Sequence, residues 1–308
     1  MALILALILA LSSFLFVRDK SVAELQGRWA PAPSQFITIL DMNVHIRDQG
    51  PRDDSEPIFL IHGTSASLHT WEGWIAELSS SRRCVSVDLP GFGLTGPDPR
   101  SDYSIQNYTR FVKGVFDFLE IERGVVGGNS LGGQIAWNFA LAYPALVSKL
   151  ILVDSAGFPL SATSIPLGFR LAGNKILSPL VKYMLPRFVV AASVQNVYGD
   201  EARVTEDLVD RYYELTLRAG NRAAVVERFK LINDASPTEK LGTLELPTLI
   251  IWGEMDRLIP PDTGIQFRDA IFGSRLVVFP GLGHVPHEED PHATVSIAKH
   301  FLGDVSIK

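Results

Sequence analysis

The sequence predicts an α/β protein with a doubly wound, mostly parallel sheet and an inserted helical lid. Short apolar runs alternate with longer amphipathic segments, and most of the runs are apolar on both faces, as central parallel strands are. A stretch without a recognisable strand, from Phe158 to Ala235, predicts the insertion. An entry hairpin and six further strands are predicted at Phe36–Leu40 with Val44–Arg47, then Pro57–Ile61, Cys84–Asp88, Gly124–Gly127, Leu150–Val153, Pro247–Trp252 and Leu276–Phe279.

The segments between these runs predict the helices and the division of the chain. Apolar residues recur every three or four positions from Ile105 to Leu119, and similar patterns occupy Leu131–Tyr143 and Pro291–Leu302, which indicates amphipathic helices. Ser21–Ser34 is polar and contains proline, which suggests a linker. We expect core segments at residues 21–157 and 236–308 and a lid at 158–235 over the strand ends, because so long a stretch is rarely a bare loop. The alternative is that these helices pack elsewhere on the sheet.

Composition excludes several classes of protein. The chain has 308 residues and a net charge of −6, whereas nucleic-acid-binding proteins usually carry a basic surface. With 46% hydrophobic and 20% charged residues, it has enough apolar surface to fold. The single cysteine, Cys84, excludes an intrachain disulfide, and its apolar neighbours predict a buried position.

The N-terminal segment predicts membrane attachment. Residues 1–17 contain no charge, and Arg18 and Lys20 follow directly. A helix of this length spans about 25 Å, near the lower limit for a bilayer core. We expect residues 1–20 to form an uncleaved anchor, with the positive charges favouring a cytoplasmic body. A signal peptide of an exported protein and an extension packed on the protein are the alternatives.

The strongest chemical motif follows the strand Gly124–Gly127. Ligands of doubly wound sheets bind beyond the carboxyl ends of the strands, and the motif GNSLGG at 128–133 lies there, before a predicted helix. Gly128 and Gly132 permit the sharp turn that lifts Ser130 out of the sheet, and the helix start supplies backbone donors. Ser130 is therefore the candidate nucleophile, which requires a neighbouring base.

Histidine and aspartate candidates follow two later strands. His284, in GLGH after Leu276–Phe279, is the candidate base, and Asp256, in WGEMD after Pro247–Trp252, is the candidate acid that orients it. Asp154, which also follows a strand, is the second candidate for the acid. Four further histidines are expected to be ordinary surface or structural residues: His45, His69, His292 and His300.

The loop after Pro57–Ile61 supplies the second half of an oxyanion hole. Gly63 allows a turn that brings the Thr64 amide towards Ser130, and the Leu131 amide is the other expected donor. His62 is interpreted as a brace for this loop. The tight turn DLPGFG at 88–93 is expected to shape the floor of the site.

Together these motifs resemble the α/β-hydrolase superfamily, in particular its lid-bearing serine hydrolases. The matching segments are HGT, DLPGFG, GNSLGG, WGEMD and GLGH, spread over residues 36–302 in the family's order. The resemblance implies a Ser–Asp–His triad and acyl transfer to water. Serine at residue 130 argues against the family's epoxide hydrolases and haloalkane dehalogenases, which use aspartate there.

The resemblance leaves the substrate open. The apolar lid and the absence of a basic cluster favour carboxylic esters of hydrophobic acyl groups, without cofactor or metal. GNSLGG also resembles the elbow of carbon–carbon bond hydrolases that act on ring-cleavage products. Those usually have a bulky aromatic residue after the histidine and a glycine-rich loop after the HG pair, whereas this chain has Val285 and Thr64-Ser65-Ala66.

Other activities remain as further alternatives. Lactonase or metal-free haloperoxidase activity could use the same triad. A non-catalytic binding protein is possible on the same fold. A metal site is the last alternative, and it would be built from the histidine and carboxylate cluster near the C-terminus: His284, His287, Glu288, Asp290 and His292.

Overall fold

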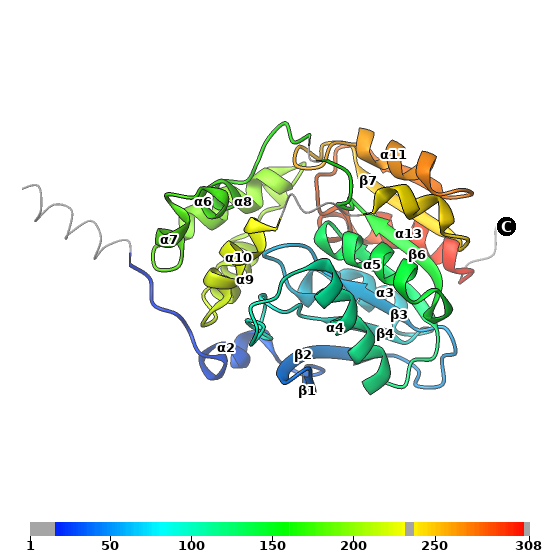
Figure 1. Cartoon of the computed structure of the whole chain (residues 1–308), viewed down its shortest axis with the longest axis horizontal. Coiled ribbons are helices and arrows are strands. Elements are labelled where there is room, and N and C mark those ends of the chain that lie inside the picture. The colour runs from blue at the N-terminus through cyan, green and yellow to red at the C-terminus, as the bar shows by residue number, and fades with distance from the viewer. Residues whose placement is uncertain (1–15, 160, 232–236, 305–308) are drawn as a thin grey trace, which may run out of the picture.

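The fold is a mixed, mostly parallel sheet that carries a helical insertion (Figure 1). A computed structural model describes residues 16–159, 161–231 and 237–304. Eight strands pair in the order β1-β2-β4-β3-β5-β6-β7-β8, in which β2 is antiparallel to both of its neighbours, β1 and β4, and all other pairs are parallel. The predicted hairpin and strands are confirmed, at β1 Gln35–Ile39, β2 Met42–Gln49, β3 Ile58–Ile61, β4 Cys84–Val87, β5 Gly124–Asn129, β6 Val147–Val153, β7 Thr248–Gly253 and β8 Arg275–Phe279.

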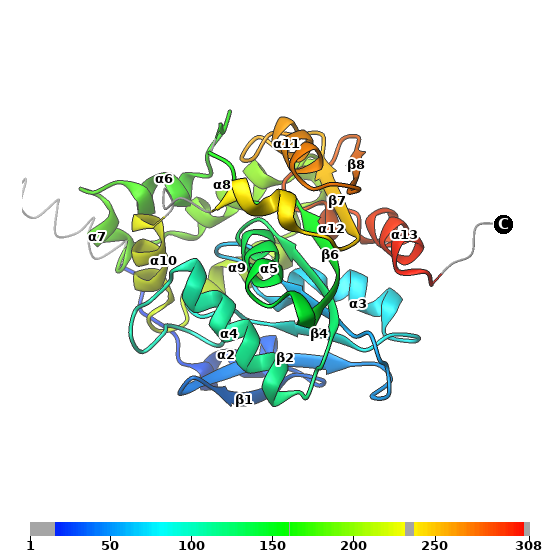
Figure 2. The same cartoon turned by 45° about the vertical axis from the view of Figure 1, so that its right-hand side comes forward.

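Helices cover both faces of this sheet, so its central strands are buried on both sides (Figure 2). Ile58 and Leu60 of β3 pack in the cluster that contains residues of α3 and α13, whereas Phe59 and Ile61 pack in the cluster with α4 and α5. This alternation explains why the strand sequences are apolar without a break. The core helices are α3 Glu72–Leu78, α4 Ile105–Phe118, α5 Leu131–Ala142, α11 Asp262–Ala270, α12 Pro286–Glu289 and α13 Pro291–Leu302.

The predicted insertion between β6 and β7 is confirmed as helical. Its helices are α6 Leu167–Gly173, α7 Ser178–Val181, α8 Arg187–Val197, α9 Glu206–Thr216 and α10 Asn221–Lys230. They gather at one end of the molecule (Figure 1). The end of α8 is attached to the core, because the amide of His284 donates to the carbonyl of Val197 at 2.7 Å. The insertion therefore contacts the loop that carries the candidate base.

The interpretation of Ser21–Ser34 as a linker is wrong, because helix α2 occupies Val22–Trp29. Ser21 and Glu24 form a capping box: the Ser21 hydroxyl accepts from the Glu24 amide, and the Glu24 carboxylate accepts from the Ser21 amide at 2.8 Å. Leu25 is buried, and the Trp29 indole donates to Glu214 of α9 at 2.7 Å. The Ser-x-x-Glu spacing was a usable signal for this helix start.

The predicted N-terminal anchor falls almost wholly on residues 1–15, which lie outside the described part of the chain. None of the helices in the described ranges is both long and apolar enough to cross a membrane. Cys84 is buried in β4 as predicted, and burial raises the pKa of its thiol to about 12.

Candidate active site

Ser130 lies on a strained turn between β5 and α5. Its backbone has φ 55° and ψ −117°, a region that residues other than glycine rarely adopt. The turn has no room for side chains at the flanking glycines, since a Cβ on Gly128 would lie 2.2 Å from the Gly132 carbonyl and a Cβ on Gly132 would lie 2.2 Å from that of Ile61. These glycines are required by close backbone contacts that hold Ser130 at the end of the sheet.

His284 and Asp256 meet across the ends of β7 and β8. Nδ1 of His284 lies 2.7 Å from Oδ2 of Asp256, and both side chains are buried. Because a carboxylate only accepts, this contact holds the ring proton on Nδ1 and leaves Nε2 free of it. The other Asp256 oxygen accepts from the amides of Leu258 at 2.8 Å and Ile259 at 3.0 Å. The carboxylate is thus fixed in the orientation that a histidine base requires.

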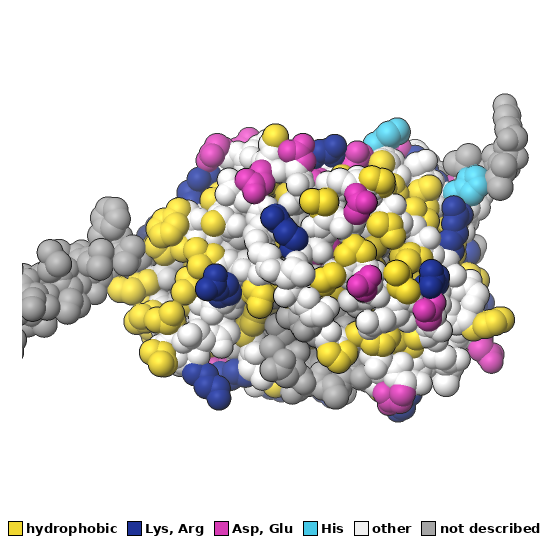
Figure 3. Space-filling model, turned by 90° about the horizontal axis from the view of Figure 1, so that it is seen from above, with side chains coloured by type: hydrophobic (Ala, Val, Ile, Leu, Met, Phe, Trp, Pro, Cys, Tyr) yellow, Lys and Arg dark blue, Asp and Glu magenta, His cyan; other side chains and the backbone are white. Residues whose placement is uncertain are grey.

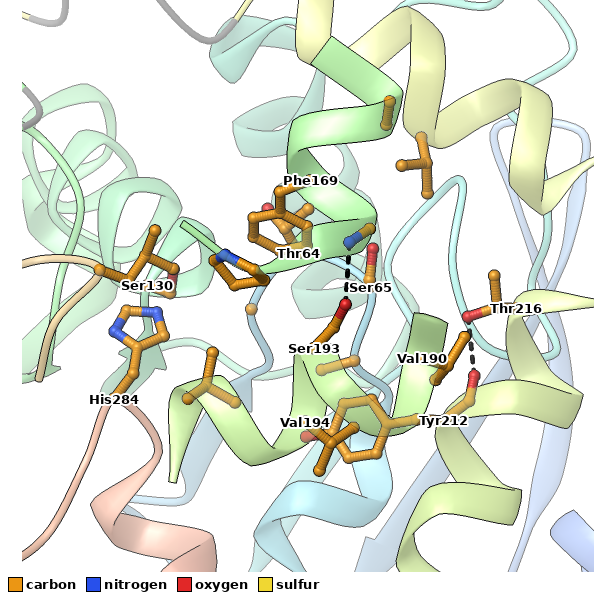
Figure 4. A pocket seen from close by; sticks show the side chains of 18 of the residues that line it. Thr64, Ser65, Ser130, Phe169, Val190, Ser193, Val194, Tyr212, Thr216 and His284 are labelled. Atoms are coloured by element: carbon orange, nitrogen blue, oxygen red, sulfur yellow. Dashed lines mark hydrogen bonds between the residues drawn. The ribbon is translucent and has the colours of Figure 1, made fainter. Parts of the chain in front are cut away.

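Ser130 and His284 line the same cavity beneath the lid, and their side chains lie side by side (Figure 4). Thr64 lines this cavity too. The loop before it approaches the serine closely, since a Cβ on Gly63 would lie 3.1 Å from the Ser130 Cβ. Leu131 is the first residue of α5, where backbone amides have no partner within the helix. Ser130, His284 and Thr64 therefore line one cavity, with Leu131 following the serine in the chain and Asp256 in contact with His284.

Asp154 lies next to this pair but does not replace Asp256. Carboxylate and ring atoms of Asp154, Asp256 and His284 lie within 4.8 Å of one another. Oδ1 of Asp154 accepts from the Gly253 amide at 3.0 Å, and burial together with the neighbouring Asp256 raises its pKa well above the usual range. We therefore interpret Asp154 as a neutral carboxylic acid that supports the strand end, while Asp256 makes the hydrogen bond to His284.

The alternative metal cluster near the C-terminus is not assembled. Glu288 binds Arg211 and accepts from the Tyr212 hydroxyl, and Asp290 caps α13 by accepting from the Ala293 amide at 3.0 Å. His287 packs against the Trp71 ring at 4.0 Å between centroids, and the exposed His292 lies 3.4 Å from Glu77. These side chains have separate partners and do not point to a common centre.

We interpret His62 as a brace because the backbone contacts both nitrogens of its ring. The Leu89 amide donates to its Nε2 at 3.0 Å, so Nδ1 carries the proton and donates to the Gly63 carbonyl at 2.7 Å. Complete burial lowers the pKa of this imidazole, which keeps it neutral. Both ring nitrogens are occupied by the backbone, and His62 joins the Thr64 loop to the turn at 88–93.

Asp88 organises that turn from the inside. Its carboxylate accepts from the amides of Leu68 at 2.8 Å and Leu94 at 2.7 Å, and it lies 2.7 Å from Nδ1 of His45. Burial alone would raise its pKa, but the neighbouring His45 holds the pKa of this carboxylate well below the usual range. The buried carboxylate thus ties three separate segments together below the site.

Replacing Asp88 by asparagine is expected to lower the free energy of unfolding by about 3 kcal/mol. The NH₂ group of the asparagine side chain would then face a hydrogen-bond donor that the carboxylate now binds, in a buried site. Urea unfolding at neutral pH measures this loss, with the exposed Asp53→Asn as control. The difference in the free energy of unfolding between wild type and variant should narrow in acid. Protonation of Asp88 removes the stability that its depressed pKa contributes. An unchanged midpoint would contradict this role for Asp88.

Two site residues were not predicted from the sequence. Asn129, inside the GNSLGG motif, donates to the His284 carbonyl at 2.9 Å and the Val153 carbonyl at 3.2 Å. Glu289 accepts from the amides of Gly283 at 2.8 Å, Gly199 at 3.0 Å and Asp200 at 2.8 Å. Asn129 could have been found from its place beside the nucleophile, whereas nothing in the local sequence marks Glu289 as the tie between the histidine loop and the lid.

The cavity wall contributed by the lid is mainly apolar. It contains Phe169, Val181, Leu185 and Val190, together with Ser193, whose hydroxyl accepts from the Gly168 amide at 2.9 Å. Arg222 is the one Lys or Arg among the described residues that line this cavity. Its buried Nε and Nη1 have no hydrogen-bond partner among those residues, while Nη2 donates to Asp19 at 2.6 Å and to the Val17 carbonyl at 2.7 Å.

Comparisons with family models, with protein sequences and with solved structures all match hydrolases. Residues 56–291 match a family model described as alpha/beta hydrolase fold. An uncharacterised protein of Mycobacterium tuberculosis is 30% identical over 89% of this chain and 82% of its own length. A 2-hydroxy-6-oxononadienedioate/2-hydroxy-6-oxononatrienedioate hydrolase of Cupriavidus pinatubonensis is 29% identical over 92% and 99%. The structure of a meta-cleavage product hydrolase from Pseudomonas fluorescens superposes with a TM-score of 0.77, at 26% identity over 88% and 98%.

Proposed function

This chain belongs to the alpha/beta hydrolase family, and from that premise we propose that it is a serine hydrolase with Ser130 as nucleophile, His284 as base and Asp256 as the orienting acid. The observation that carries the proposal is the His284–Asp256 contact of 2.7 Å beside a strained Ser130 in one cavity. Strain at a buried polar turn persists where the surrounding structure enforces it, which is common at active sites.

The geometry supports a two-step acyl transfer. Ser130 Oγ attacks a carbonyl carbon as its proton passes to Nε2 of His284, and the oxyanion forms near the amides of Leu131 and Thr64. The tetrahedral intermediate collapses to an acyl-serine, and the leaving group takes the proton from His284. Water then gives a proton to His284 and attacks the acyl carbon, which releases the acid and restores Ser130.

Hydrolysis of a carbon–carbon bond is the first candidate reaction, because relatives that are 27% and 29% identical to this chain are named as hydrolases of 2-hydroxy-6-oxo acids. Such a substrate combines a ketone, which Ser130 would attack, with a carboxylate, which needs a cation in the cavity. Arg222 supplies one whose buried Nε and Nη1 are unpartnered among the described residues, and guanidinium binds carboxylate well. Val285 in place of an aromatic residue after His284 remains a difference from the pattern expected for this class.

Hydrolysis of carboxylic esters with hydrophobic acyl groups is the second candidate. It is favoured by the apolar lid residues that face Ser130 across the cavity, such as Phe169 and Leu185. Apolar walls would hold an acyl chain without any charge on the substrate.

One substitution separates the two substrate classes. Arg222→Gln is expected to raise KM for a 2-hydroxy-6-oxo dienoate by about 10- to 100-fold, because a hydrogen bond to a charged group is lost. Hydrolysis of a neutral nitrophenyl ester should stay within about threefold, since no carboxylate is bound. Steady-state kinetics on one preparation of each protein measure both.

Asp19→Asn is the matched control, because it removes the ion pair of Nη2 and leaves Nε and Nη1 unchanged. A role for Arg222 in the carbon–carbon reaction requires that KM for the dienoate rises in Arg222→Gln and stays unchanged in Asp19→Asn. Wild-type enzyme that hydrolyses the ester and leaves the dienoate intact would exclude the first candidate in favour of the second.

A further inference from the structure

The outer side of the lid exposes a cluster of large apolar side chains. We define the lid patch as Ile176, Leu177, Leu180, Tyr183 and Phe188, whose exposed fractions are 84%, 38%, 50%, 60% and 65%. Figure 3 shows hydrophobic side chains gathered at the end of the molecule where the described chain begins, with Lys and Arg side chains beside them. Exposed apolar residues that cluster in this way usually mark an interaction site.

The same short segment is apolar on its inner side. Phe169, Ala172, Val181 and Leu185 line the cavity that contains Ser130, while the lid patch faces outwards from the same stretch of chain. A surface helix normally has a polar outer face, and helices that are apolar all round are normally covered on both sides. Among the residues that the structure describes, the outer face of the lid is therefore left exposed.

The charged side chains of the segment that carries the lid patch have one sign. Residues 155–199 contain four cationic side chains, Arg170, Lys175, Lys182 and Arg187, and no Asp or Glu, in a chain whose net charge is −6. Lys182 and Arg187 have acidic neighbours on α9 and α10. Arg170 and Lys175 are exposed and have no ion-pair partner within the described ranges. This segregation favours an anionic surface as the partner.

The N-terminal segment reaches the lid at the same place. The Val17 amide donates to the Tyr183 carbonyl at 2.9 Å, next to the lid patch. Phe16 is 57% exposed, and the sequence before it contains no charged side chain. The apolar run that predicts an anchor thus joins the described structure at the uncovered face of the lid.

We propose that the lid patch docks on a lipid bilayer with anionic headgroups. Apolar side chains enter the boundary between headgroups and acyl chains, and Arg170 and Lys175 contact the headgroups, as in amphipathic segments that lie in the membrane interface. Docking brings the inner wall of the lid, and therefore the cavity, within one helix layer of the bilayer. This gives apolar substrates dissolved in the membrane a short path to Ser130, whichever carbonyl bond is cleaved.

A single fluorescent probe tests the docking independently of catalysis. Leu180→Cys in the full chain can be labelled with a nitrobenzoxadiazole group, because Cys84 is buried and its raised pKa of about 12 keeps it unreactive. Adding vesicles of phosphatidylcholine and phosphatidylglycerol should increase the emission about threefold as the probe leaves water. Phe272→Cys, at an equally apolar and 93% exposed residue after α11, is the matched control and should not respond.

The charges are tested on the same labelled protein. Arg170→Gln combined with Lys175→Gln should raise the lipid concentration for half-maximal emission by about tenfold or more, as each cation near an anionic surface contributes to binding. An unchanged spectrum at residue 180 would overturn the proposal. The proposal would also be overturned if the emission increased with protein concentration in the absence of vesicles. A second copy of the chain would then cover the patch. Loss of substrate turnover with normal docking would count against the proposed function alone.

Discussion

Ser130→Ala is expected to lower kcat by about 10⁵-fold or more, because removal of the nucleophile leaves only binding and the oxyanion donors to act on the substrate. The fold should remain intact, since no hydrogen bond between the Ser130 hydroxyl and another described residue supports the turn. The Ser130 backbone keeps its contacts, which include the hydrogen bond from its amide to the Val153 carbonyl at 3.0 Å. Steady-state kinetics with a chromogenic ester or a dienoate measure the loss, and thermal unfolding confirms the fold.

Ser193→Ala is the matched control for this experiment. Ser193 lines the same cavity, and its hydroxyl accepts from the Gly168 amide within the lid. Its loss should change kcat by less than about tenfold, because no bond to the substrate is formed there. Substantial turnover by Ser130→Ala, or a comparable loss in Ser193→Ala, would refute Ser130 as the nucleophile.

Asp256→Asn is expected to lower kcat by about 10⁴-fold, whereas Asp154→Asn should cost less than about tenfold. An asparagine at residue 256 can present its amide N–H to Nδ1 of His284, which then holds the wrong tautomer for a base that faces Ser130. An asparagine at residue 154 resembles the neutral acid already there and can still accept from the Gly253 amide. Equal losses in the two variants would contradict the assignment of Asp256.

The pH dependence of stability gives these two variants a second readout. Because the pKa of Asp154 is raised, the folded chain keeps the proton on this carboxyl at pH values where the unfolded chain has released it, above the ordinary pKa of aspartate. Stability therefore falls as the pH rises from that range towards the folded pKa. Asp154→Asn should remove this decline, which urea unfolding at several pH values can detect. A decline that persists unchanged in Asp154→Asn would contradict the assignment of this pH dependence to Asp154.

The central strands and the main motifs could be predicted because their signals are local. Runs such as PIFLI at 57–61 are apolar without interruption, and GNSLGG at 128–133 combines small residues with a serine at a strand end. Helix α2 was missed although its capping box is also local, because the proline and polar residues of this segment suggested a linker. The capping box formed by Ser21 and Glu24 is a better guide to this segment than its composition.

The sheet, the helical insertion and the candidates Ser130, Asp256 and His284 could all be read from local sequence patterns. Three-dimensional contacts were needed to show which carboxylate contacts His284, because Asp154 and Asp256 both follow apolar strands but have different neighbours in space. They also show that Glu289 ties the histidine loop to the lid and that Arg222, in the cavity wall, has donors that are unpartnered among the described residues. The physical reason is that strand and helix patterns follow from neighbours in the chain, whereas hydrogen bonding and burial of charge depend on residues far apart in sequence.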